Sequence, residues 1–173
     1  MRPIVSAFLY FGIVLFSFAP CVAQTPAATL EIQMPESKFA LGTPIRLDVT
    51  IKNISTERLH IWKVSPQDDG RAEAYMSVEV LDSEGKSLPR IDGVTFVHDG
   101  KKDMMPKSWT RKGVTVKANQ ELHDFLLLSN LFDLSKPGMY TVSVKTDIPK
   151  PNPGSQIKFV VVASNSINFA VKQ

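Results

Sequence analysis

The sequence predicts an all-β fold, a single antiparallel sandwich of about eight to ten short strands. The first observation is the strict alternation in 45–52, where apolar Ile45, Leu47, Val49 and Ile51 are separated by polar residues. The second is the regular recurrence of turn chemistry, with strand-like segments spaced by about 8–15 residues. The third is that strand patterns do not alternate with helical ones, which disfavours a doubly wound α/β fold.

The first half of the chain supplies four of the predicted strands. A strand over 30–34 ends at Pro35, and the clean alternation of 45–52 forms the next one. We expect 59–64 to be the partner strand of 45–52, across a connector at 53–57. A strand at 76–81 then leads into a hairpin-type turn, in which Gly85 is able to take positive φ.

The second half continues the pattern after a stretch without a clear period. We expect a short strand at 94–97, an exposed loop at 98–106, and further strands around Val114 and over 120–129. A helical turn is predicted near 130–135. The three prolines and the glycine of 148–154 predict irregular structure there. Strands at 157–162 and 167–171 close the chain, with a kink or bulge at 165–166 between them.

The segment 133–145 is the most informative part of the chain. Pro137 and Gly138 form a turn, after which Tyr140, Val142 and Val144 share one face of a strand. A Tyr at this place resembles the tyrosine corner of immunoglobulin-like sandwiches, where the ring is buried and its hydroxyl bonds nearby backbone.

Three segments together carry a wider resemblance, namely Gly42-Thr-Pro-Ile-Arg-Leu-Asp-Val-Thr-Ile-Lys-Asn53, Pro137-Gly-Met-Tyr140 and the stretch 164–171. With them the chain resembles bacterial immunoglobulin-like or fibronectin-like domains, and more distantly the proteinase-inhibitor domain family called BsuPI. The resemblance implies a fold and, for BsuPI, inhibition of a protease. The Trp and Cys hallmarks of antibody domains are missing, so that subgroup is excluded.

The N-terminus predicts export. Arg2 is followed by the apolar run 4–19, and Cys21-Val-Ala23 offers small residues before a signal-peptidase site. We therefore expect a cleaved secretory signal at 1–23, a flexible leader at 24–29 and the sandwich domain at 30–173. An uncleaved anchor is disfavoured because the run is shorter than the roughly 20 residues of a span, and Pro20 before the cysteine disfavours lipidation. The protein would then be periplasmic or extracellular.

Export also limits the possible functions. Cleavage would remove the single cysteine and with it any disulfide, which favours a bacterial envelope protein stabilised by its core. Lys+Arg would fall from 20 to 19 against 17 acidic residues, a net charge of about +2, too mild to argue for nucleic acid. After the signal, no apolar stretch is long enough to span a bilayer.

The chain carries none of the common catalytic motifs, so we predict that it is not an enzyme and needs no cofactor. A copper site is a weaker alternative, because imidazole and thioether sulfur suit Cu(I). Its candidate ligands are His98 with Met104 and Met105. His60 and His123 fit better as half-exposed strand residues. Asp68-Asp69-Gly70 is too short for a calcium site and fits a solvated turn.

The segment 98–112 is the best candidate for recognition, since it combines basic and apolar side chains in a predicted loop. Its candidate partner-binding residues are Lys101, Lys102, Met104, Met105, Lys107, Trp109 and Arg111. The alternative is that Trp109 and one Met fold back on the sandwich while the lysines keep the loop soluble. Trp62 is expected to pack on the core or a sheet face.

We predict a secreted, non-catalytic binding or accessory module of the bacterial cell envelope. It would recognise a protein partner through the 98–112 loop, or through an exposed strand edge that accepts another chain. The alternative is a protease inhibitor, as the BsuPI resemblance implies, with Lys107 or Met105 in the specificity pocket. The third possibility is a periplasmic copper-binding protein.

Overall fold

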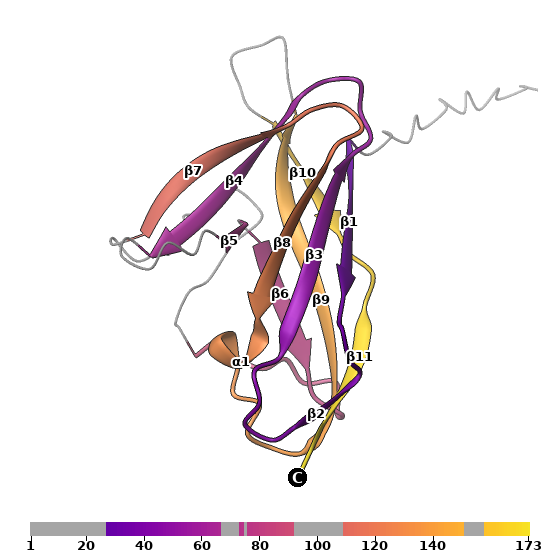
Figure 1. Cartoon of the computed structure of the whole chain (residues 1–173), viewed down its shortest axis with the longest axis vertical. Coiled ribbons are helices and arrows are strands. Elements are labelled where there is room, and N and C mark those ends of the chain that lie inside the picture. The colour runs from indigo at the N-terminus through magenta and orange to yellow at the C-terminus, as the bar shows by residue number, and fades with distance from the viewer. Residues whose placement is uncertain (1–26, 67–72, 75, 92–108, 151–157) are drawn as a thin grey trace, which may run out of the picture.

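The computed structural model describes residues 27–66, 73–74, 76–91, 109–150 and 158–173. In these ranges the chain is nearly all β, with a single short helix, α1 (Leu128–Leu131). The strands form three sheets, two of which are the layers of an elongated sandwich (Figure 1). The predicted all-β antiparallel sandwich is therefore confirmed.

The first layer contains β1 (Ala28–Gln33), β3 (Arg46–Asn53) and β8 (Glu121–Leu127), with β3 between its two neighbours. All pairings in it are antiparallel. In β3 the predicted alternation is observed, because Leu47, Val49 and Ile51 are buried while the residues between them reach solvent. A strand with this pattern can lie only on the surface of a core, with one face toward it.

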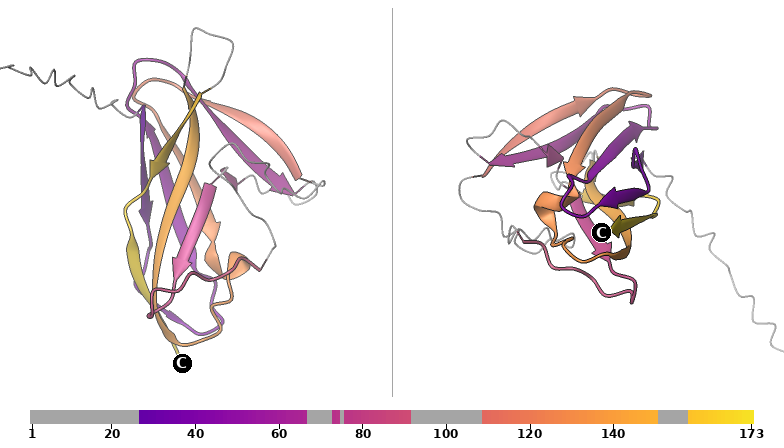
Figure 2. Two further views of the ribbon diagram at one scale, coloured as in Figure 1. Left: turned by 180° about the vertical axis from the view of Figure 1, so that it is seen from behind. Right: turned by 60° about the horizontal axis from the view of Figure 1, so that its bottom comes forward.

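The second layer is built around the long strand β9 (Gly138–Lys150). β6 (Met76–Leu81) pairs with one of its edges. β11 (Ile167–Lys172) and β10 (Lys158–Ala163) pair in succession with the other edge, as Figure 2 shows from behind. β2 (Lys38–Ala40) continues the layer by pairing in parallel with β11.

The junction between β10 and β11 is a bulge, which confirms the predicted kink. Ala163 faces Lys145 on β9, whereas Ile167 faces Val142. The segment from β10 to β11 therefore has one more residue than β9 between these two pairs. A one-residue insertion exchanges the two faces of a strand. It therefore keeps Val162 before the bulge and Phe169 after it on the same buried side.

The core fills the space between the two layers. The largest fully buried side chains come from both layers and from α1, and they include Ile32, Leu47, Ile51, Leu126, Leu128, Phe132, Ile148 and Phe169. Fully burying one such aliphatic or aromatic side chain is worth roughly 1.5–3 kcal/mol. The core therefore stabilises the sandwich without help from a disulfide.

The third sheet departs from one expectation. It contains β4 (Leu59–Pro66), β7 (Trp109–Val116) and the short β5 (Glu73–Ala74). We expected 59–64 to pair with 45–52, but β4 pairs with β7 from Leu59 opposite Val116 to Pro66 opposite Trp109. The prediction of a hairpin was wrong because the chain turns away from the first layer after Asn53 instead of folding back onto β3.

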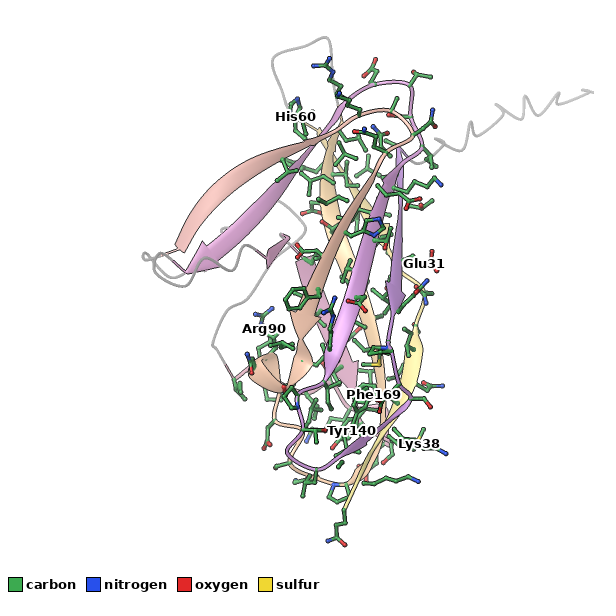
Figure 3. All side chains as sticks on the ribbon, viewed as in Figure 1. Glu31, Lys38, His60, Arg90, Tyr140 and Phe169 are labelled. Carbon is green, nitrogen blue, oxygen red and sulfur yellow. The ribbon has the colours of Figure 1, made fainter. Side chains whose placement is uncertain are left out.

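The predicted tyrosine corner is confirmed. Tyr140 is only 5% exposed, and its hydroxyl donates to the carbonyl oxygen of Lys136 at 2.7 Å. Its ring stacks on Phe169 of β11 with centroids 5.5 Å apart, and Figure 3 shows the two side chains next to each other near the lower end of the sandwich. Burial raises the pKa of Tyr140, with a further contribution from the charges of Asp133 and Asp82.

Three predicted boundaries need correction. β1 begins at Ala28, which is buried, so the last two residues of the expected leader belong to the sandwich. β8 ends at Leu127 and the helical turn follows at once, earlier than expected. β9 continues through Pro149 to Lys150, because at that end its ladder toward β6 has already stopped at Thr146. A missing N–H is tolerated where one edge of a strand has no partner.

The turn after β6 has the predicted chemistry. Gly85 has a φ of +77°, and the Asp82 carboxylate accepts the N–H groups of Glu84 and Lys86, both at 2.9 Å. The chain then returns along β6, where the Leu88 N–H donates to the Val80 carbonyl oxygen. The strand expected at 94–97 and the loop expected at 98–106 lie outside the described residues.

Candidate functional site

The predicted recognition segment is only partly within the described structure. Lys101, Lys102, Met104, Met105 and Lys107 lie outside the described residues. The last part of the segment, 109–112, is the beginning of β7 rather than a loop, which corrects the expected boundary. Trp109 stands opposite Pro66 and Arg111 opposite Val64 in the register of the β4–β7 pair.

β4 and β7 form a ribbon that leans away from the sandwich (Figure 1). The end of the ribbon near the sandwich is anchored by Leu59, Ile61 and Val116, which are all buried. Trp109 and Pro66 lie at the opposite end of the paired length. The strand pairing therefore places the predicted recognition residues of β7 at the far end of a ribbon whose near end is part of the core.

Asn53, the last residue of β3, stabilises the place where the chain leaves the first layer and enters the ribbon. Its side chain is 0% exposed and makes four hydrogen bonds. Its amide Nδ2 donates to the carbonyl oxygens of Glu57 at 2.7 Å and Val116 at 3.0 Å. Its Oδ1 accepts the N–H of Ser55 at 2.9 Å and the Ser55 hydroxyl at 2.7 Å. All four positions of a neutral amide are thus occupied.

The backbone of Asn53 also bonds the segment that connects β7 to β8. Its N–H donates to the Gln120 carbonyl oxygen, and its own carbonyl accepts from the Asn119 N–H, both at 3.0 Å. Asn119 adopts a φ of +60°, which Asn tolerates better than most residues. One buried residue therefore joins β3, the start of β4, the end of β7 and the turn into β8. Asn53 ends the motif that carries the family resemblance, but its position alone gave no sign of this role.

A second exposed feature lies on β10. Phe159 is 53% exposed and Val161 is 48% exposed on its outer face, while Val162 is buried on the inner face. The segment Phe159-Val-Val-Val-Ala163 is therefore apolar on both faces of the strand. Such a run normally indicates a strand that is covered on both sides. β10 instead lies at the margin of its layer and pairs with β9 alone among the described strands.

The histidines lie as predicted for strand residues. His60 on β4 and His123 on β8 are both exposed. Each ring shares a hydrogen bond with a threonine on the neighbouring strand, Thr115 for His60 at 3.2 Å and Thr50 for His123 at 3.1 Å. Within the described residues, no three His, Cys, Asp or Glu side chains are grouped as a metal site would require. His98, Met104 and Met105 lie outside the described residues, so the copper prediction stays a prediction.

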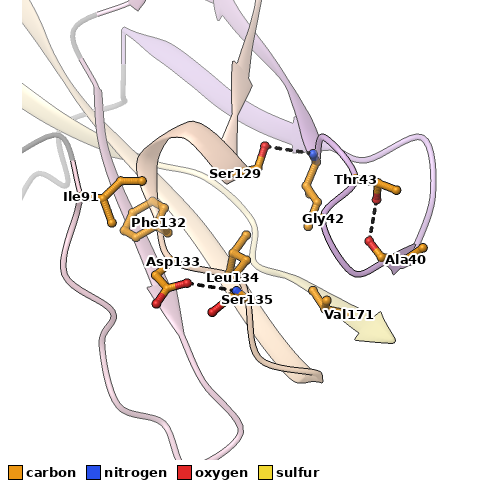
Figure 4. A pocket seen from close by; sticks show the side chains of 11 residues that line it. Ala40, Gly42, Thr43, Ile91, Ser129, Phe132, Asp133, Leu134, Ser135 and Val171 are labelled. Carbon is orange, nitrogen blue, oxygen red and sulfur yellow. Dashed lines mark hydrogen bonds between the residues drawn. The ribbon is translucent and has the colours of Figure 1, made fainter. Parts of the chain in front are cut away.

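A pocket of about 430 Å³ lies beside α1 at the lower end of the sandwich (Figure 4). Its polar side chains bind nearby backbone. Thr43 donates to the Ala40 carbonyl oxygen at 2.7 Å, Ser129 accepts the Ile45 N–H at 3.4 Å, and Asp133 accepts the Ser135 N–H at 3.1 Å. Hydrogen bonds from the Ser135 hydroxyl and N–H lower the pKa of Asp133.

The groups lining this pocket do not form a catalytic set. None of the described lining residues is a histidine, and the group beside Ser135 that could accept a proton is the Asp133 carboxylate. A carboxyl group with a lowered pKa is a poor proton acceptor at neutral pH. The arrangement fits a set of loop contacts that close the end of the sandwich.

The outer face of the β3–β8 pair carries a ladder of cross-strand contacts. Arg46 lies over the Phe125 ring of β8 at 4.5 Å, and it also pairs with Asp48 on its own strand at 2.6 Å. Lys52 pairs with Glu121 at 3.0 Å across the two strands. These pairs are solvent-exposed and balance one another in charge, so each adds little to stability.

No protein-family model matches the chain, and no curated protein matches it in sequence. Solved structures with a similar arrangement include the CARDB domain of the PF1109 protein from Pyrococcus furiosus in complex with di-metal ions. It is 13% identical with a TM-score of 0.42, over 86% of this chain and 90% of that one. The C-terminal domain of wzt is 12% identical with a TM-score of 0.46, over 86% and 75%. The sporulation control protein Spo0M from Bacillus subtilis is 13% identical with a TM-score of 0.40, over 86% and 51%.

Likeness at this level concerns the arrangement of strands, and the chain is not assigned to a family. The resemblance to BsuPI domains stays a prediction. In the part of the chain that the structure describes, no helix has the length and apolar character of a membrane span.

Proposed function

We propose that the chain is a secreted, non-catalytic binding module of the bacterial cell envelope, which recognises a protein partner with the far end of the β4–β7 ribbon. The observation that carries the proposal is the position of Trp109 and Arg111 on β7, at the end of the ribbon that points away from its anchored base. Trp and Arg are the residue types most enriched among the energetic centres of protein interfaces.

The anchoring of the ribbon supports this proposal. Residues that bind a partner are most effective when a rigid scaffold holds them, because less conformational freedom is lost on binding. Here the near end of the ribbon is fixed by the buried side chains of Leu59, Ile61 and Val116 and by the hydrogen bonds of Asn53. The basic and apolar residues of 101–107 directly precede β7 in sequence and extend the same region of the chain.

The test is site-specific cross-linking in the native cell. A photo-reactive amino acid replaces Arg111 on the ribbon in one strain. In the matched control strain it replaces Lys86, a basic residue of the exposed turn after β6. The expected result is one adduct of defined mass from position 111, identified by mass spectrometry and missing from position 86. Equal adducts from both positions, or none from 111, would contradict the proposal.

A companion variant separates recognition by the ribbon from the loss of the fold. Deleting 101–107 should abolish the adduct at position 111 while thermal unfolding of the purified protein stays cooperative. Absence of the chain from the periplasmic and extracellular fractions would refute the exported location independently of the binding surface.

Protease inhibition is the second candidate, and one feature of the ribbon favours it. An inhibitor presents an extended segment that is held rigidly at its ends. Met105 and Lys107 precede β7 in sequence, and β7 begins at Trp109, which pairs with Pro66 of β4. If the chain is an inhibitor, Lys107→Ala should weaken inhibition of a protease that cleaves after basic residues, whereas Lys86→Ala should not. Failure to inhibit any protease of a broad panel would remove this candidate.

A further inference from the structure

We propose that the free edge of β7 binds an extended, acidic segment of the protein partner, which joins the β4–β7 pair as an additional strand. This proposal rests on the proposed function, because it names the way in which the same ribbon recognises its partner. It starts from the position of β7 at the margin of its sheet and from the charges that the two paired strands carry.

β7 has a neighbouring strand on one side only. The order of its sheet is β5-β4-β7, so β4 is flanked on both sides while β7 forms the margin. β4 also packs against β9, and β5 lies near β8, whereas β4 is the described element that packs along β7. Figures 1 and 2 show β7 as the outermost strand of the ribbon from opposite directions. Because hydrogen bonding alternates along an antiparallel pair, every second residue of 109–116 directs its N–H and C=O away from β4.

The ribbon lacks part of the support that a sheet normally has. A ribbon of two strands is at best marginally stable in water without a further strand or a packed layer. Buried Leu59, Ile61 and Val116 hold its near end, and β5 adds a third strand only opposite Lys63 and Val64. A strand added along β7 would supply support over the rest of the paired length. This edge is therefore suited to accept an extended segment of another protein.

The sequence of β7 leaves its edge accessible to another backbone. No proline interrupts 109–116, so each residue keeps its backbone N–H. Gly113 is exposed and stands opposite Trp62 in an unbroken register, so it does not mark a bulge. A Gly inside a regular strand is typical of a place where another backbone approaches closely. At Gly113 the edge is free of side-chain bulk.

The charges of the ribbon indicate the chemistry of the added strand. β4 and β7 contain Lys63, Arg111 and Lys112 and no acidic residue. Lys63 stands directly opposite Lys112, a position in which like charges destabilise a strand pair. The acidic residue of the described sheet, Glu73, lies on β5, on the far side of β4 from this edge. Basic residues on an edge disfavour pairing with a second copy of the same strand, and they favour a segment that carries acidic side chains.

Cross-linking from successive positions of β7 in the native cell is the direct test. A photo-reactive amino acid replaces Arg111, Gly113 or Thr115, each in a separate strain. Thr50 is the matched control, because like Thr115 it bonds a histidine on the neighbouring strand. We expect the same partner from all three positions of β7 and no adduct from Thr50. The cross-linked residue of the partner should move along one extended, acidic segment, by about two residues for each step of two along β7.

The outcomes separate this proposal from the proposed function. An adduct from position 111 without adducts from 113 and 115 would leave recognition by the far end of the ribbon in place and would overturn addition to the edge. No adduct from any of the three positions would contradict both. An adduct with a second copy of the chain, or with a segment that has no acidic residue, would overturn the proposed occupant.

A charge reversal on β7 tests the role of the basic residues. Lys112→Glu should lower the yield of the adduct from position 115 at least about threefold, because it places like charges between β7 and the acidic segment. The same change puts Glu opposite Lys63, which favours the β4–β7 pair, so a lower yield cannot come from a weakened ribbon. Lys112→Arg should retain the yield, and Lys86→Glu in the turn after β6 should leave it unchanged. An unchanged yield in Lys112→Glu would overturn the acidic character of the partner segment.

Discussion

Replacing Asn53 by Ala should strongly destabilise the protein, although the side chain that is lost is small and polar. The residue is fully buried, and its amide supplies hydrogen bonds to Glu57, Val116 and Ser55 at the place where three strands and two connections meet. Ala leaves these partners in position but removes the group that satisfied them. The protein therefore loses stability because buried polar groups stay out of water without a hydrogen-bond partner.

The expected loss in the free energy of unfolding follows from the number of side-chain hydrogen bonds that Asn53 makes. Four side-chain hydrogen bonds, at a net value of about 1 kcal/mol each, give a loss of about 3–5 kcal/mol in the free energy of unfolding. The bond to the Val116 carbonyl is the most buried and sets the upper part of this range. For a domain of about 150 residues, such a loss lowers the melting temperature by roughly 10 °C.

Urea unfolding followed by circular dichroism measures the effect, with two variants for comparison. Asn53→Asp has the same shape and keeps the acceptor for Ser55, but it turns a carboxylate oxygen toward the Glu57 and Val116 carbonyls. It should be at least as damaging as Asn53→Ala. Asn168→Ala removes an exposed amide that accepts a hydrogen bond from the Thr141 hydroxyl at 2.8 Å, and it should cost less than about 1 kcal/mol. A loss at Asn53 no larger than that at Asn168 would refute the reasoning.

Further expected effects concern three individual residues, namely Tyr140, Asn165 and Gly85. Tyr140→Phe removes the bond to the Lys136 carbonyl and should cost about 1 kcal/mol in urea unfolding. Because burial raises the pKa of Tyr140, the neutral form stabilises the fold below the unfolded pKa of about 10, and this stability is lost as the pH rises through the higher folded value. Melts from pH 8 to 11 should therefore fall more steeply for the unchanged protein than for Tyr140→Phe. Asn165→Ala frees both backbone groups of Ile32, and hydrogen exchange of the Ile32 amide should accelerate at least about tenfold. Gly85→Ala has open space for its methyl group but retains a φ of +77°, so it should cost roughly 1 kcal/mol through backbone conformation alone.

The sequence was most informative where one residue pattern had one physical solution. The alternation in β3 could bury only Leu47, Val49 and Ile51, and the turn before Tyr140 could only direct that ring into the core. The change of parity between Val162 and Phe169 required an extra residue between them, and the bulge supplies it. In each case a local pattern was enough because the constraint was local.

The predictions that were wrong or missing concern features that depend on residues far apart in the sequence. Alternation identifies a strand but not its partner, so β4 was assigned to β3 although it pairs with β7, which is some 50 residues away in sequence. Pro149 indicates a break only if both edges of a strand are paired, and the end of the β6 ladder is not visible in sequence. The role of Asn53 depends on Val116 and Gln120, which only the fold brings near it.

These distant contacts also connect the sandwich to the proposed recognition surface. The ribbon has one buried end, and the hydrogen bonds of Asn53 join that end to β3 and to the turn into β8. Breaking them should therefore loosen the ribbon before it unfolds the sandwich, because most of the core side chains come from the other two sheets. A binding defect in Asn53→Ala at a temperature where the sandwich is still folded would then arise from lost rigidity of the ribbon and not from a lost contact with the partner.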